Sequence, residues 1–158
     1  MMEATQFKDS KGLIWTININ IGHYLAMKSK LGIDITESFE VEGNWMTKLA
    51  SHENIEVLLS MIDILLESER QSRELTLDQM YEGFDGEVIA SATNALIEGI
   101  VVFLPAHKRK ALRLIVDSVE VGMERAILMM EQEEKEIREN LIPMIDANLA
   151  KLKDKNSQ

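Results

Sequence analysis

The sequence predicts an α+β fold that is predominantly α-helical, with an N-terminal β-hairpin packed on a helical bundle and a long C-terminal helix. Two patterns carry this prediction. Near the N-terminus, apolar and polar residues alternate from residue 13 to residue 21, which is the period of a half-buried strand. Further along, apolar residues recur every three or four positions, which is the period of helices that bury one face.

The hairpin is expected near the start of the chain. Asp9-Ser-Lys-Gly12 has the composition of a tight turn in which Gly12 adopts a positive φ, and Phe7 then lies on the partner strand. Two strands alone are barely stable in water, so the apolar face of the hairpin has to pack on helices. That face is predicted to carry Leu13, Trp15, Ile17, Ile19 and Ile21.

Helices in the first two thirds of the chain are bounded by recognisable caps. Gly32 is expected as a left-handed C-cap, Thr76 with Gln79 has the form of a capping box, and Asp85 is expected as an N-cap. Pro105 ends the last of these helices. The expected helices cover residues 22–31, 45–50, 54–70, 76–81 and 87–104, with a polar connector over 33–43.

The chain is expected to divide into three parts. Residues 1–105 form the hairpin and helical core, residues 106–153 form a long helix that Pro143 kinks, and residues 154–158 form a disordered tail. The long helix carries a near-heptad apolar stripe, interrupted by an acidic run over 131–136. A helix of this kind either folds back on its own domain or meets another subunit. The stripe comprises Leu112, Val116, Val119, Met123, Ala126 and Met130, then Ile137, Leu141, Ile145 and Leu149.

Composition argues against several classes of function. A net charge of −10 disfavours binding to nucleic acid and to anionic membranes. The chain has no cysteine, which excludes disulfides, thiol catalysis and cysteine-ligated zinc. The three histidines, His23, His52 and His107, are far apart in the sequence, and no phosphate-binding glycine loop or nucleophile motif occurs. We therefore expect neither an enzyme nor a metal or cofactor site.

Targeting signals are not expected either. The N-terminal residues lack the basic and apolar segments of a signal peptide, and no apolar run reaches the length of a membrane span. The chain is accordingly interpreted as a cytoplasmic protein that does not bind membranes.

One dense basic patch stands out in this acidic chain. It lies at the start of the long helix, where cations oppose the helix dipole. The patch is a candidate polar contact for an acidic partner or for nucleic acid, or else a solubilising turn paired with glutamates elsewhere in the chain. It consists of Lys108, Arg109, Lys110 and Arg113.

Two segments together resemble a known family. The first contains Phe7, Asp9, Gly12, Trp15, Ile17 and Ile19, followed by the Gly32-Ile-Asp-Ile35 step; the second is the helix from Phe84 to Pro105. In this order and spacing they are similar to phage tail assembly chaperones over roughly residues 5 to 115. Gly99 departs from the family pattern within the second segment.

The resemblance implies a helper protein that is absent from the virion. Such chaperones bind the helical, hydrophobic tape measure protein in the host cytoplasm and promote its assembly with tail tube subunits. A homo-oligomer is expected, and the alternative functions are a structural virion component of the tail or connector and a nucleic-acid-binding regulator. The residues expected to bind a partner helix are Met123, Ile127, Met130, Ile137 and Leu141.

Overall fold

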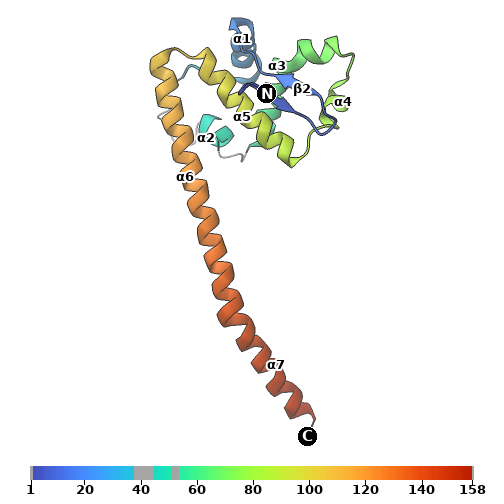
Figure 1. Ribbon diagram of the computed structural model, residues 1–158, viewed down its shortest axis with the longest axis vertical. Helices are drawn as coiled ribbons and strands as arrows, with labels where there is room; N and C mark the ends of the chain where they lie inside the picture. Colours follow the sequence, from blue (N-terminus) through green and yellow to red (C-terminus); the bar gives the residue numbers. More distant parts are fainter. Residues whose placement is uncertain (1, 38–44, 51–53, 158) are drawn as a thin grey trace. The chain divides into compact units, whose positions relative to one another are not determined.

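The computed structural model of the chain describes residues 2–37, 45–50 and 54–157 (Figure 1). The predicted fold class is confirmed: the described chain is mostly helical, with a two-stranded antiparallel hairpin at the N-terminus and a long helical C-terminal segment. The chain forms two compact units, Met1–Glu120 and Val121–Gln158, which are described separately below.

The hairpin consists of β1 (Gln6–Lys8) and β2 (Ile14–Thr16), with Phe7 opposite Trp15. Three of the five predicted inward residues, Trp15, Ile17 and Ile19, are buried, as is Phe7 on the partner strand, and Leu13 is partly buried against the core. The prediction was wrong for Ile21, which is exposed and begins the first helix. The alternation of buried and exposed residues ends before Ile21, because the side chain of Asn20 accepts a hydrogen bond from the backbone amide of His23 and so caps the helix that begins at Ile21.

The buried carboxylate of Asp9 organises the hairpin turn. It accepts hydrogen bonds from the backbone amides of Lys11 (3.0 Å) and Leu13 (2.9 Å) and from the indole Nε1 of Trp15 (2.9 Å). Gly12 has a φ of 88°, a left-handed conformation that a residue with a side chain adopts only at a cost. The turn and the central tryptophan of the hairpin are therefore fixed by one acidic side chain.

A helix covers the open edge of β2. Glu69 accepts a hydrogen bond from the backbone amide of Thr16 (3.2 Å), and Arg73 donates one to the carbonyl of Ile14 (2.6 Å). Glu69 and Arg73 also pair with each other, and the guanidinium lies 4.3 Å from the centre of the Trp15 ring. These contacts occupy the groups with which a further strand would pair, so the small sheet stops at two strands.

The helices of the first unit follow the predicted boundaries closely. Gly32 is a left-handed C-cap with a φ of 66°, Thr76 forms the predicted capping box, and Asp85 accepts a hydrogen bond from the amide of Val88. Residues 38–43 of the predicted connector and His52 lie outside the described residues. The helices are α1 (Ile21–Leu31), α2 (Trp45–Ala50), α3 (Ile55–Ser72), α4 (Leu77–Tyr81) and α5 (Gly86–Phe103).

The core of the first unit lies between the hairpin and the two long helices α3 and α5 (Figure 1). Strand β1 packs on α5, β2 packs on α3, and α2 contacts both helices. The buried side chains are mainly aliphatic, and four methionines fill gaps between them: Met27, Met46, Met61 and Met80. These four methionines are thus part of the hydrophobic core.

The Gly32-Ile-Asp-Ile35 step is stabilised by contacts of the Asp34 side chain. Its carboxylate accepts hydrogen bonds from the amide (2.9 Å) and hydroxyl (2.6 Å) of Thr36 and lies 3.2 Å from the Nζ of Lys28. The hydrogen bond from the Thr36 hydroxyl is the largest of the effects that lower the pKa of Asp34 to about 2. The folded state therefore favours the ionised form of the Asp34 carboxyl group.

This lowered pKa predicts a pH dependence of stability. An aspartate titrates near 3.8 when unperturbed, so the contribution of Asp34 is present above about pH 4 and disappears as the pH falls towards 2. Asp34→Asn is expected to lower the free energy of unfolding by about 1 kcal/mol at neutral pH and much less at pH 2. Urea denaturation across this range measures the difference. A constant difference from pH 7 to pH 2 would contradict the proposed role of the charge.

Candidate partner-binding helix

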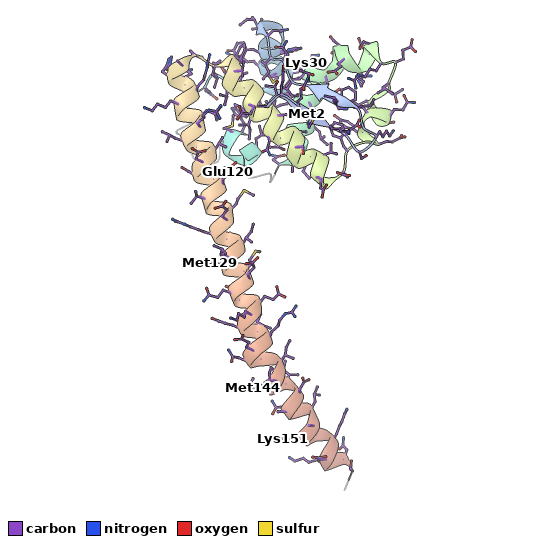
Figure 2. The ribbon with its side chains drawn as sticks, viewed as in Figure 1. Met2, Lys30, Glu120, Met129, Met144 and Lys151 are labelled. Carbon is purple, nitrogen blue, oxygen red and sulfur yellow. The ribbon has the colours of Figure 1, made fainter. Side chains whose placement is uncertain are left out.

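The second unit is a single run of helix (Figure 2). It contains the C-terminal part of α6 (Ala106–Glu136), a π-helical turn η1 (Ile137–Leu141) and α7 (Ile142–Asn156). Helix α7 passes the predicted helix end at residue 153, so residues 154–156, which we expected to be disordered, are helical. Gln158 lies outside the described residues.

The first turns of α6 belong to the first unit. Leu112 is fully buried, and Ile115, Val116 and Val119 pack against the core. The first unit therefore extends to Glu120, fifteen residues beyond the predicted domain end at 105, because the beginning of the apolar stripe is used within the fold. The stripe continues into the second unit, where its residues are exposed.

From residue 120 to residue 157 every described residue is exposed. The predicted partner-binding residues all lie in this region, with exposed fractions between 36% for Met123 and 68% for Met130. The spacings of four, three, seven and four residues between them place them on one side of a helix. They are Met123, Ile127, Met130, Ile137 and Leu141. We did not predict Leu152, which is 59% exposed and follows Ile145 at heptad spacing.

A π-turn precedes the proline at which a kink was predicted. The amide of Ile142 donates to the carbonyl of Ile137, five residues earlier, and Pro143 lies in the first turn of α7. Proline lacks an amide hydrogen and its ring collides with the carbonyl four residues before it, which disturbs the regular helix at this place. The helix thus changes its hydrogen-bonding pattern where the sequence places Pro143.

The predicted basic patch is largely engaged within the chain. Lys108 donates to the carbonyl of Thr36, and Arg109 donates to the carbonyl of Leu104 (2.6 Å). Arg113 forms a two-pronged pair with Glu98 at 3.0 and 3.2 Å, and this hydrogen bonding raises the pKa of Arg113. Lys110, the fourth member of the patch, is exposed. The observed contacts correspond to the intramolecular alternative more than to a free cationic surface.

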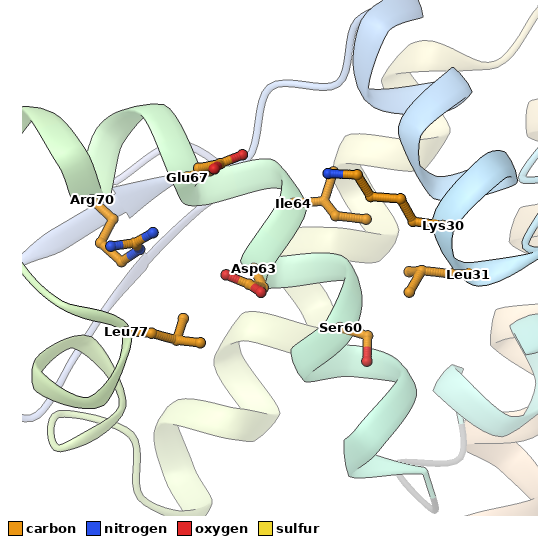
Figure 3. A pocket seen from close by; sticks show the side chains of 8 residues that line it. All are labelled: Lys30, Leu31, Ser60, Asp63, Ile64, Glu67, Arg70 and Leu77. Carbon is orange, nitrogen blue, oxygen red and sulfur yellow. The ribbon is translucent and has the colours of Figure 1, made fainter.

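A cavity of about 330 Å³ lies between α1, α3 and α4 (Figure 3). Its charged lining is mixed, with Lys30 and Arg70 beside Asp63 and Glu67, and the Arg70 Nη1 is already bonded to the carbonyl of Leu75 (2.8 Å). The remaining lining residues are Leu31, Ser60, Ile64 and Leu77. The charges of opposite sign offer no clear selectivity for an anion or a cation.

Chemical groups that could form a metal site are not gathered in the described residues. No cluster of three or more His, Asp or Glu side chains is present there. The Nδ1 of His23 accepts a hydrogen bond from the amide of Asn20 (3.3 Å), which is a capping contact, and His107 is exposed. His52 is not among these residues.

One described helix, α5, has the length and apolar composition of a membrane span. Half of this helix is buried inside the first unit, where it packs against the hairpin. Its apolar character is accounted for by that packing, since the core helix of a folded domain satisfies the same criteria.

We compared the chain with known protein families, curated proteins and solved structures. No protein-family model matches the sequence, and neither a curated protein nor a solved structure was found to match it.

Proposed function

We propose that the protein is a phage tail assembly chaperone that binds the tape measure protein through the exposed apolar side of its second unit. The single observation that carries the proposal concerns the helical run of the second unit. Every described residue in it is exposed, although one side of the helix is apolar. The resemblance of residues 5 to 115 to such chaperones supplies the identity of the client. The proposed activity is binding, and it promotes assembly of the client with tail tube subunits.

The chemistry of this surface fits a helical client. An amphipathic client helix recognises a partner through apolar residues on one face, and large exposed apolar surfaces on soluble proteins mark interaction sites. The segment from residue 121 to residue 130 is rich in methionine, and two of its methionines, Met123 and Met130, are exposed on the apolar side. Methionine side chains are flexible and polarisable, so they adapt to clients of varied sequence.

Co-expression with the tape measure protein tests the proposal. The variant Met123→Ser/Ile127→Ser/Met130→Ser removes the apolar side of this segment, and we expect client binding to weaken at least about tenfold. Leu128→Ser/Met129→Ser is the control, because these two residues are also apolar and exposed but lie on other sides of the helix. Co-elution on a sizing column and the solubility of the client are the measurements.

Each result decides a separate point. If the wild-type protein neither solubilises the client nor elutes with it, the proposed function is wrong. If both variants bind as the wild type does, the function stands but this side of the helix is not the site. Mass spectrometry of purified particles addresses the alternative of a structural virion component, because a chaperone is expected to be absent from them.

A further inference from the structure

The part of the second unit after the acidic run has an apolar row of its own. Its members are the exposed residues Ile137, Leu141, Ile145, Leu149 and Leu152. A spacing of four residues turns about 40° around a regular helix at each step, so such a row would wind around it. The π-turn Ile137–Leu141 adds one residue to a turn and thereby brings the following members back towards the same side.

Among the described residues of the second unit, no side chain packs over this apolar row. All described residues there are exposed, and the ion pairs that support the helix are two exposed i,i+4 pairs, Arg138 with Glu134 and Lys135 with Glu139. Such pairs contribute only a few tenths of a kcal/mol each, whereas most of the stability of a helix in a protein comes from the packing of its apolar face. A second helix that covers the apolar row would supply the missing stabilisation.

The charges around the row indicate which helix covers it. Glutamates precede the row, at positions 131, 133, 134 and 136, and lysines follow it, at positions 151, 153 and 155. A parallel copy would place glutamates beside glutamates and lysines beside lysines, which is repulsive. An antiparallel copy reverses the order, so that each acidic end meets a basic end.

The antiparallel arrangement also aligns the apolar side chains. When two copies are centred on Pro143, Ile137 lies opposite Leu149, and Leu141 lies opposite Ile145. The flanking charges then form two opposite-sign pairs, Lys153 with Glu133 and Lys155 with Glu131, and one like-charge pair, Lys151 with Lys135. In the alignment that matches the apolar side chains, two of the three lysines therefore meet a glutamate.

We infer that two copies of this chain associate through residues 131–155 as an antiparallel helix pair centred on Pro143. The inference does not rest on the proposed function. Pairing would cover two of the five predicted partner-binding residues, Ile137 and Leu141, whereas Met123, Ile127 and Met130 lie outside the paired region and stay available for a client. Loss of self-association and loss of client binding are thus separate results.

Disulfide cross-linking tests the orientation, because the natural chain has no cysteine. The full-length variants Ile137→Cys and Leu149→Cys are oxidised alone and as a mixture, with Leu128→Cys as the control for random collision. We expect a disulfide-linked dimer in the mixture and only the control level for each variant alone. Self-linking of each variant alone would indicate a parallel pair, and control-level linking in the mixture would indicate no pair; either result overturns the inference.

Charge reversal tests the pairing energetically by analytical ultracentrifugation of the full chain. Lys153→Glu/Lys155→Glu and Glu131→Lys/Glu133→Lys are each expected to weaken self-association at least about tenfold, and an equimolar mixture should restore it. Glu124→Lys/Arg125→Glu exchanges charges outside the paired region and should leave association unchanged. A wild-type protein that stays monomeric, or a mixture that does not recover, overturns the inference.

Discussion

Trp15→Ala is expected to lower the free energy of unfolding of the first unit by about 3–5 kcal/mol. The indole is completely buried, and its removal leaves a cavity in the centre of the hairpin. It also removes one of the hydrogen bonds to the buried carboxylate of Asp9 and the contact with the Arg73 guanidinium. Chemical denaturation followed by circular dichroism measures the loss.

Two further variants separate the contributions of Trp15. Trp15→Phe keeps most of the buried ring but loses the indole donor, and we expect a cost of about 1–3 kcal/mol from the unpaired oxygen of Asp9. Trp45→Ala is the matched control, because Trp45 is only partly buried against the core. If Trp15→Ala keeps its stability but loses a partner, the hairpin is an interface and not a structural element.

The local signals in the sequence predicted most of the first unit. The turn at Asp9, the left-handed Gly32, the capping box at Thr76 and the N-cap at Asp85 all occur where their residue types placed them. Each of these features depends on a few adjacent residues. Because the physical cause is local, one sequence is sufficient to read it.

Features that depend on tertiary contacts were less accessible. Alternation placed Ile21 on the strand, but the cap formed by Asn20 starts a helix there instead. The division of the long helix at Glu120 depends on which residues of the apolar stripe reach the core. The sequence does not reveal this point, because the period of the stripe is the same on both sides of it. The contacts between the end of α3 and the edge of β2 likewise join residues more than fifty positions apart.

The partner-binding role of the candidate site stays a prediction. The five predicted apolar residues are exposed on the second unit, as a partner-binding side requires, whereas most of the predicted basic patch contacts its own chain. Nothing in the residues around Lys108 indicates that the carbonyl of Thr36 lies within its reach. The π-turn was also not predicted, although Pro143 provided the signal for a disturbance nearby.

Gly99 shows how a residue that looks unfavourable in the sequence is required by the packing. A glycine inside a helix costs about 1 kcal/mol relative to alanine, so the sequence alone favours Gly99→Ala as a stabilising change. In the structure, a Cβ atom added at Gly99 would lie 2.5 Å from the Cγ2 of Ile17. Ile17 is itself buried, so neither side has room to move away. The close approach of α5 to the segment after β2 thus depends on the missing side chain.

We therefore expect Gly99→Ala to lower the free energy of unfolding by about 1–3 kcal/mol, as overpacking of a filled core does. Gly86→Ala, in the same helix, is the control: no neighbouring atom lies within 4 Å of its added Cβ, and stability should hold or rise. Ile17→Ala removes the colliding methyl group, so Gly99→Ala should cost much less in that background. Urea denaturation of the four members of this cycle measures the coupling. Equal costs in both backgrounds would show that the two residues do not meet.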